Sequence, residues 1–478
     1  MFNRLLLLLM SFFMVCTATE AKVRLAHVVG DDMVVQQQTA VRLWGWSTPG
    51  FEVRVSPSWT TKIYTTSVAK DGKWEVRVKT PKASYTPLSI VFDDNDSKPV
   101  TISRVLSGEV WVCAGQSNME MPIRGFYACP VEGSNEVIAE ANGLRGIRYV
   151  KVPSVMSMTP LDDANCQWKP ADATNVSDCS AVGYFFAQTV NRAIDVPVGL
   201  ILANKGGTRV ESWLNESNLR KYTDEPLDTM GIVRRYPTDY LRALVWGNGT
   251  FHPIINYTIR GILFYQGCSN VGAPAGQYSS RLKLLVDQWR KDFGQGDFPF
   301  YYVQVAPFAS GNKDGDWNSL LRQQQYDASR DIPNSGIVCI QDLVYPYEVN
   351  QIHPAQKRQV GQRLAYLALN QQYGLRELPC LSPSFKSMTI SGDTCFVKLD
   401  NTYHSMSRWQ DIDGFEVAGA DRKFYPAKAT WSFERGVAIR SDAVQKPVAV
   451  RYCWRNFQMG NFANAAGLPL FPFRTDQW

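Results

Sequence analysis

The chain has 478 residues, of which 45% are apolar and 20% are charged. This composition is ordinary for a globular protein, and the length exceeds what one hydrophobic core normally organises, so we expect two or three domains. The net charge of +6 is spread along the sequence without a block of like charges, which argues against nucleic acid as a partner.

The N-terminus has the pattern of a secretory signal. Arg4 provides the positive charge, Leu5 to Val15 form an apolar run, and Ala18 or Ala21 offers a small residue for cleavage. The run is shorter than the ~18 apolar residues that a membrane helix needs, and no later segment reaches that length. We therefore predict that residues 1–21 are a signal peptide and that the chain is exported, periplasmic or secreted, with no integral membrane segment.

Two features of the cysteines bear on this prediction. Cys16 would allow lipidation, but Val15 stands where lipoprotein signals have a small residue, so a lipoprotein is the less favoured alternative. Nine of the ten cysteines follow the predicted cleavage site, and an odd count leaves at least one thiol free. No CxxC pair or His/Cys cluster has zinc spacing, so we expect no metal and no other cofactor.

The positions of six cysteines suggest whether each is a free thiol or part of a disulfide. Cys113 and Cys339 lie inside apolar runs and are predicted to be buried thiols. The other four form two pairs that are close enough in sequence for disulfides. These pairs are Cys166 with Cys179, and Cys380 with Cys395.

Residues 22–105 alternate apolar and polar residues with a period of two, as in Val41 to Trp46 and Trp74 to Val78. This pattern predicts a small antiparallel β domain, sandwich-like in form. Residues 377–478 return to the same pattern, in runs such as Thr394 to Leu399 and Gly436 to Arg440, and predict a second β domain.

Between these two segments, residues 106–376 alternate strand-like and helical stretches. The strand-like runs are Val110 to Ala114, Ile147 to Val152, Val198 to Ala203, Gly261 to Tyr265, Phe300 to Val305 and Gly336 to Ile340. The clearest helices are Val182 to Ile194, Arg281 to Phe293, Leu320 to Arg330 and Pro354 to Tyr373. Such alternation predicts an α/β domain whose parallel sheet has helices on both faces.

Chemically active residues follow the ends of several of these runs. Ser117 comes just after the first run, Gly206-Gly207 after the third, and Gln266 to Asn270 after the fourth. Because the carboxyl ends of parallel strands meet at one edge of the sheet, these residues can converge. His353, one of only four histidines, opens the last predicted helix and is the candidate base. A nucleophile, donors and a base in this pattern favour a serine hydrolase.

The same motifs resemble the sialate O-acetylesterase family, a carbohydrate esterase branch of the SGNH hydrolases. The resemblance rests on Gly115-Gln116-Ser117-Asn118-Met119, Gly206-Gly207-Thr208, Tyr265-Gln266-Gly267 and Ile352-His353-Pro354 with Lys357. It extends to Asp31 to Gln37 near the N-terminus and to Asn464 to Pro469 near the C-terminus, and so covers nearly the whole mature chain. It implies a flavodoxin-like catalytic domain with accessory antiparallel β domains and no metal.

The resemblance also implies roles by position. Ser117 matches the nucleophile, whose N–H joins Gly207 and Asn270 as oxyanion donors, and His353 matches the general base. Gln116 and Gln266, which flank these motifs, are expected to contact the substrate. The implied partner is an acetylated carbohydrate, with 9-O-acetylated sialic acid as the first candidate and acetylated xylan or another plant glycan as the alternative.

Two departures from the family pattern leave parts of the site open. Cys268 stands where the family usually has glutamate, which removes a carboxylate near the cleft. Asn350 stands where many SGNH enzymes have the aspartate that orients the histidine. Asp342 is our first choice for that third member, with Glu348, a backbone carbonyl or Asn350 itself as alternatives.

The orienting acceptor can also be absent, which would leave a Ser-His dyad with a weaker hold on the imidazolium. The missing aspartate therefore keeps open a function of another class, a catalytically weak glycan-binding protein on the same scaffold. The oligomeric state is not indicated by the sequence.

Overall fold

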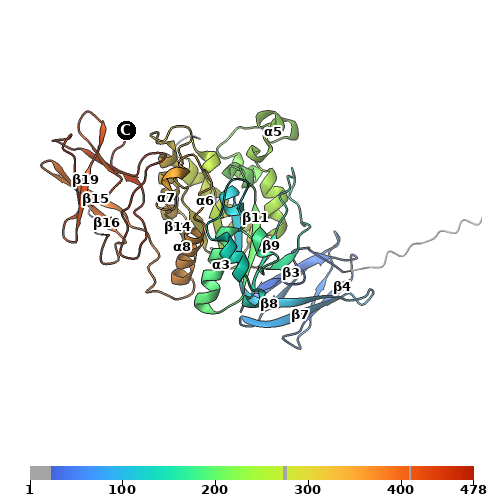
Figure 1. Ribbon diagram of the computed structural model, residues 1–478. Coiled ribbons are helices and arrows are strands. Elements are labelled where there is room, and N and C mark those ends of the chain that lie inside the picture. The colour runs from blue at the N-terminus through green and yellow to red at the C-terminus, as the bar shows by residue number, and fades with distance from the viewer. Residues whose placement is uncertain (1–22, 273–276, 408–410) are drawn as a thin grey trace, which may run out of the picture.

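The computed structural model describes residues 23–272, 277–407 and 411–478, and the predicted signal, residues 1–21, lies outside them. A central α/β part lies between two groups of β-strands, one at each end of the molecule (Figure 1). The predicted fold class is confirmed: a parallel sheet is flanked by helices and accompanied by separate antiparallel β-sheets.

The N-terminal strands form the first group. They are β1 (Arg24–Leu25), β2 (Val34–Gln36), β3 (Ala40–Trp46), β4 (Glu52–Pro57), β5 (Tyr64–Ser67), β6 (Lys73–Lys79) and β7 (Ser84–Asp93). Strands β1, β3 and β6 make one antiparallel sheet, and β4 pairs with β5 and β7. In β6, Trp74, Val76 and Val78 are buried and the residues between them are exposed, as expected for a sheet with one face on a core.

One long strand, β8 (Val100–Gly115), belongs to both the N-terminal and the central part. Its first half pairs with β7 and β2, and its second half pairs in parallel with β11 (Val198–Asn204) and β12 (Gly261–Tyr265). The same backbone therefore fixes the N-terminal strands relative to the central sheet.

The central sheet has the order β10-β9-β11-β8-β12-β13-β14, and only β10 runs antiparallel to its neighbour. The remaining strands are β9 (Ile147–Lys151), β10 (Trp168–Pro170), β13 (Phe300–Val303) and β14 (Ser335–Val338). From β11 to β14 the order is the flavodoxin-like 2-1-3-4-5 arrangement, in which ligands bind at the carboxyl ends of the strands where the chain switches direction. Here that point is the end of β8, between β11 and β12.

Four long helices cover the sheet, two on each face (Figure 1). Alternate residues of β8 point to opposite faces. Trp111 and Cys113 pack with α3 (Ala181–Ile194) and α8 (Arg358–Gln371), whereas Val110 and Val112 share the other core with α6 (Tyr278–Phe293) and α7 (Trp317–Asp331).

Shorter helical segments lie in the connections. The α-helical ones are α1 (Ser117–Glu120), α2 (Ser134–Glu140), α4 (Glu216–Leu219) and α5 (Thr229–Arg235). The others are η1 (Gly143–Arg145), η2 (Val176–Asp178), η3 (Val210–Trp213), η4 (Asp239–Leu241), η5 (Gly247–Phe251), η6 (His252–Ile254), η7 (Cys268–Asn270) and η8 (Pro346–Glu348).

The C-terminal strands form two four-stranded sheets around a third core. The first has the order β15 (Ser384–Ser391), β16 (Thr394–Asp400), β20 (Gly436–Arg440) and β19 (Lys428–Ser432). The second has the order β18 (Phe424–Pro426), β17 (Phe415–Ala418), β21 (Ala449–Tyr452) and β22 (Phe473–Arg474). Aromatic rings of Phe415, Tyr452 and Phe473 pack against one another in the core.

The two predicted disulfides are wrong. All four cysteines are free thiols, and the members of each pair belong to different cores. Cys166 packs on the first hydrophobic cluster and Cys179 lies in the second, while Cys380 lies in the second and Cys395 in the third. Sequence separation therefore gave no measure of their distance in space. Cys113 and Cys339 are buried thiols, as predicted.

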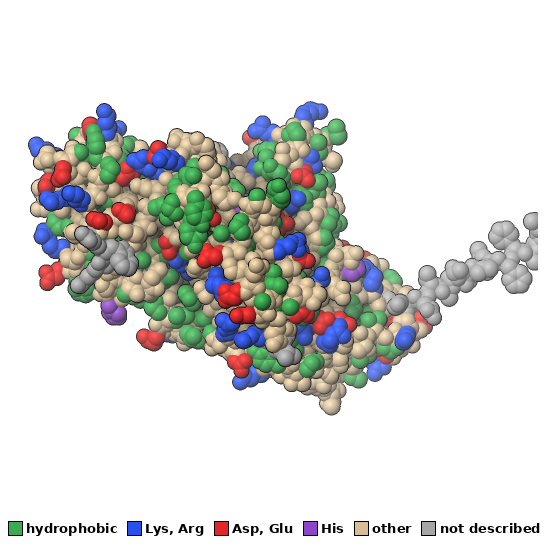
Figure 2. Space-filling view, in the orientation of Figure 1, with side chains coloured by type: hydrophobic (Ala, Val, Ile, Leu, Met, Phe, Trp, Pro, Cys, Tyr) green, Lys and Arg blue, Asp and Glu red, His purple; other side chains and the backbone are tan. Residues whose placement is uncertain are grey.

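Two surface properties are relevant to partners. Lys, Arg, Asp and Glu side chains are interspersed on the face shown in Figure 2, without a broad field of one sign. No helix in the described ranges is both long and apolar enough to cross a membrane.

Glu109 joins the N-terminal strands to the catalytic part, and we predict that its substitution destabilises the chain. The carboxylate is buried and accepts hydrogen bonds from Gln36, Gln37, Arg260 and Tyr373. Glu109→Ala leaves these donors without their acceptor, so we expect a loss of about 3 kcal/mol in the free energy of unfolding, measured by denaturant titration.

The control for this experiment is Asp287→Asn. Asp287 makes an exposed ion pair with Lys283 one helical turn away, so its loss should cost about 0.5 kcal/mol or less. Equal effects of the two substitutions would contradict the role given to Glu109.

Candidate active site

Ser117 lies at a sharp corner between β8 and α1, as the sequence predicted. Gly115 has φ +132°, and a Cβ there would lie 2.3 Å from the carbonyl oxygen of Tyr265, so only glycine fits. The Gln116 N–H donates to that same carbonyl at 3.0 Å, and the Gln116 side-chain oxygen accepts from the Gly267 N–H at 2.9 Å. The nucleophile turn is therefore fixed to the end of β12.

His353 meets Ser117 across 236 residues of sequence, with Nε2 2.8 Å from the Ser117 Oγ. This is the distance that a base needs to take the hydroxyl proton. The prediction that His353 opens a helix was wrong, because α8 begins only at Arg358 and His353 lies in the preceding loop. An edge-to-face contact with Phe126, with ring centroids 5.4 Å apart, also holds the imidazole.

Asn118 and Lys357 hold the nucleophile turn to the histidine loop. The Asn118 amide donates to the Ile352 carbonyl at 3.0 Å, directly before His353. The Lys357 ammonium donates to the Asn118 side-chain oxygen at 2.6 Å, and Lys357 is only 1% exposed. Lys357 was part of the motif behind the resemblance, but its spacing from His353 did not reveal its contact with the nucleophile turn.

Burial and charge keep His353 neutral. Desolvation, and then the nearby Lys357 charge, lower the pKa of His353 to about 4. Burial also lowers the pKa of Lys357 to about 7. A neutral imidazole is the form that accepts a proton, so this environment holds His353 as a base at neutral pH.

The loop after β11 supplies backbone donors beside the nucleophile. A Cβ on Gly206 would lie 3.3 Å from the Ser117 Cβ, and the Gly206 N–H donates to Glu120 at 2.7 Å. Gly207 has φ +76°. Among the described residues, neither the Ser117 nor the Gly207 N–H has an acceptor, which leaves both available to an oxyanion. The contact between Glu120 and the Gly206 N–H is not part of the site expected from the sequence.

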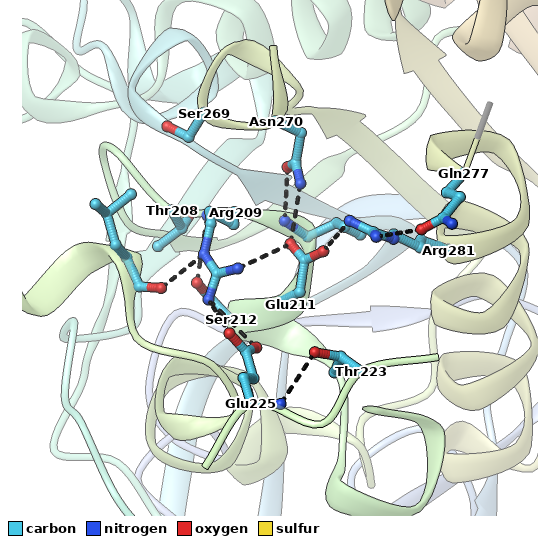
Figure 3. Close-up of polar contacts among 12 residues, drawn as sticks. Thr208, Arg209, Glu211, Ser212, Thr223, Glu225, Ser269, Asn270, Gln277 and Arg281 are labelled. Atoms are coloured by element: carbon cyan, nitrogen blue, oxygen red, sulfur yellow. Dashed lines mark hydrogen bonds and ion pairs between the residues drawn. The ribbon is translucent and has the colours of Figure 1, made fainter. Parts of the chain in front are cut away.

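Asn270 and Gln266 have partners within the protein. The Asn270 amide donates to Glu211 at 2.9 Å, and its oxygen accepts from the Val210 N–H (Figure 3). Gln266 donates to the Thr208 carbonyl and to the Asn270 oxygen. Both side chains therefore hold the loop between β11 and η3, residues 205–209, which we call the oxyanion loop. Gln116, also expected to meet substrate, is 2% exposed and pins Gly267 as described above.

Asp342 is not brought to His353. Both of its carboxylate oxygens bind Arg363, at 2.7 and 2.6 Å. The Nδ1 of His353 instead faces the Cys129 thiol at 3.8 Å, and Cys129 in turn donates to the Gln351 side-chain oxygen at 3.6 Å. This Cys129 contact had no signal in the sequence.

None of the other acceptors considered takes the place of the aspartate within the described residues. Glu348 accepts the N–H groups of Tyr345 and Ala355 and so shapes the loop. No carboxylate, backbone carbonyl or Asn350 contact reaches Nδ1. The geometry is that of a Ser-His pair with a thiol behind the imidazole.

Cys268 lies near Lys357, where the family pattern has glutamate. Burial raises the pKa of this thiol to about 11, which keeps it protonated at neutral pH and disfavours a role as nucleophile. Lys357 therefore has no carboxylate from this position; its ammonium donates to Asn118 and lies over the Tyr265 ring, 5.8 Å from the centroid.

The comparisons with known proteins agree with this geometry. Residues 107–370 match the family model described as carbohydrate esterase, sialic acid-specific acetylesterase. The chain belongs to that family. It is therefore a carboxylic ester hydrolase of the carbohydrate esterase type, as the resemblance predicted.

Individual relatives span nearly the whole chain. Sialate O-acetylesterases from Homo sapiens and Pongo abelii are each 26% identical to it, over 94% of this chain and 92% of theirs. The crystal structure of a carbohydrate acetylesterase from Xanthomonas citri superposes with a TM-score of 0.85 at 30% identity, covering 96% of this chain and 100% of that one.

For this family member we predict an unusually acidic pH profile. His353 must be neutral to accept the Ser117 proton, and its pKa is about 4, so activity falls only as the pH drops through about 4. The measurement is kcat/KM for p-nitrophenyl acetate against pH, with circular dichroism to show that the fold persists. Lys357→Met removes the positive charge that disfavours protonation and should move the midpoint upward. A wild-type midpoint near 6.5 would contradict the account.

A second prediction concerns Asp342. Because Arg363 takes both carboxylate oxygens, Asp342→Asn should leave kcat/KM within about threefold of wild type, whereas loss of a true triad aspartate costs about 10⁴-fold in kcat. Thermal unfolding measured in parallel separates lost stability from lost chemistry. A drop of several thousandfold in a folded variant would restore Asp342 to the triad.

Proposed function

We propose that this family member removes O-acetyl groups from sugar hydroxyls through an acetyl-serine intermediate. The observation that carries the proposal is the 2.8 Å contact between the Ser117 Oγ and the His353 Nε2, beside the N–H groups of Ser117 and Gly207, which have no acceptor in the described part of the chain. The contact also weighs against the glycan-binding protein without activity, because such a protein has no need of a base aligned on a serine.

The proposed reaction has two steps. His353 takes the Ser117 proton as Oγ attacks the acetyl carbonyl, and the two N–H groups stabilise the oxyanion. The C–O bond to the sugar then breaks, and His353 gives its proton to the leaving sugar oxygen. In the second step His353 takes a proton from water, which attacks the acetyl carbonyl of acetyl-Ser117. The bond from the acetyl carbon to the Ser117 Oγ then breaks, His353 returns the proton to Oγ, and acetate leaves.

The acetylated sugar itself has two candidates. The names of the curated relatives favour sialic acid, with the 9-O-acetyl ester as the proposed substrate. A neutral plant glycan such as acetylated xylan is the second candidate, because the arginines beside the oxyanion loop are already neutralised: Arg209 pairs with Glu225, and Arg281 pairs with Glu211. We further propose that the chain is exported, on the signal-like pattern of residues 1–21.

Acetate release tests both the nucleophile and the substrate. Wild type and Ser117→Ala are compared on 9-O-acetylated sialic acid and on acetylated xylo-oligosaccharide. We expect release from at least one substrate and a fall of at least about 10³-fold in the mutant, because the serine is the atom that accepts the acetyl group. Release from xylan alone would keep the mechanism and change the substrate, and release that persists in Ser117→Ala would overturn the proposal.

A further inference from the structure

A cavity of about 750 Å³ lies beside the oxyanion loop, within the volume range typical of ligand sites. We call it the arginine pocket, and Arg209, Arg235 and Arg281 line it. Ser269 also lines it, and its hydroxyl donates to the Gly207 carbonyl at 2.8 Å. The pocket and the nucleophile therefore share one loop, whose other side lies against Ser117.

The charges of the arginine pocket are balanced. Three carboxylates also line it, those of Glu211, Asp224 and Glu225, and two of its three arginines are paired with them. Glu211, only 2% exposed, accepts from Arg281 at 2.6 Å and from Asn270 at 2.9 Å, as Figure 3 shows. Arg209 pairs with Glu225 at 3.3 Å. A ligand carboxylate that bound Arg209 or Arg281 would have to break these pairs, whereas neutral hydroxyl groups can bind to the remaining lone pairs and N–H groups.

Two buried polar atoms at the pocket have no partner in the described residues. They are the Tyr222 hydroxyl oxygen and the Arg281 Nε. A buried polar group without a hydrogen bond costs free energy, so such atoms mark places where a ligand or water binds. Arg281 lies over the Tyr222 ring, with its guanidinium carbon 4.6 Å from the centroid, so one stacked pair presents both atoms.

Aromatic surface accompanies these polar groups. Arg209 lies over the ring of Tyr236, 4.1 Å from the centroid, and Tyr236 lines the pocket. Arg235, at the end of α5, is exposed and has no carboxylate partner among the described residues. Dense hydrogen-bonding groups next to aromatic faces suit a sugar ring, which has hydroxyls at its rim and C–H groups on its faces.

We propose that the arginine pocket binds an uncharged sugar ring of the acetylated glycan whose ester lies at Ser117. This inference rests on the proposed function, and it adds that the enzyme recognises a glycan of more than one sugar unit. The Tyr222 hydroxyl and Arg235 contact the hydroxyls of that ring, and the paired carboxylates fix Arg209 and Arg281 beside it.

The test uses two variants of the pocket on the full chain. Tyr222→Phe removes only the unpartnered hydroxyl, and Arg235→Ala removes the unpaired guanidinium. Each should raise KM for acetylated xylo-oligosaccharide about fivefold, the effect of one hydrogen bond, without changing kcat/KM for p-nitrophenyl acetate, which is too small to reach the pocket. Arg234→Ala, next to Arg235 on α5 but outside the pocket, is the matched control and should change neither value.

Direct binding separates this inference from the esterase itself. Calorimetric titration with the non-acetylated oligosaccharides xylotetraose and cellotetraose should show binding to wild type that weakens about fivefold in both pocket variants, whether or not acetate is released. Free N-acetylneuraminic acid is the charged probe and should show no such dependence. Weakening for the charged probe alone, no weakening for any neutral sugar, or an equal fall with p-nitrophenyl acetate would each overturn the inference.

Discussion

Strand β8 is the constraint on which the rest of the structure depends. Its 16 residues belong first to the N-terminal sheet and then to the parallel sheet, and they end at the corner that carries Ser117. Gly115 makes this ending possible, because any side chain there would collide with the carbonyl of Tyr265. A chain with a conventional residue at this point would push β8 away from β12. Strand β8 thus connects the N-terminal strands, the central sheet and the nucleophile directly.

The active site also depends on contacts between segments that are far apart in the chain. Asn118 joins the nucleophile turn to the carbonyl before His353, and buried Lys357 holds Asn118 in place. The same ammonium, together with burial, disfavours protonation of His353. Desolvation and the Lys357 charge therefore keep His353 as a neutral base. In a triad the carboxylate has the opposite effect, because it stabilises the protonated imidazolium. The thiol of Cys129 is a poor substitute for that carboxylate: its contact with Nδ1 orients the imidazole of His353 more than it stabilises a positive charge on the ring.

Much of this arrangement could be predicted from the sequence, because periodicity and strand ends are local signals. Strand β12 has the predicted bounds, and Ser117 lies at the predicted corner. The contacts of Asn270 and Asp342 could not be predicted in this way, because they depend on neighbours that only the fold brings close. Glu211 accepts from Asn270, and Arg363 donates to Asp342. The disulfide prediction failed for a related reason, because residues close in sequence can belong to different hydrophobic cores. The domain boundaries at residues 105 and 376 stay predictions.

The central claim is that Ser117 is a nucleophile activated by a neutral His353. Its most direct test is labelling of the protein with a fluorophosphonate, followed by mass spectrometry of the digested chain. The account predicts one adduct, on the peptide that contains Ser117, and a labelling rate that falls at least about 100-fold in His353→Ala. An adduct on another serine, or labelling of Ser117 at the same rate without His353, would contradict it.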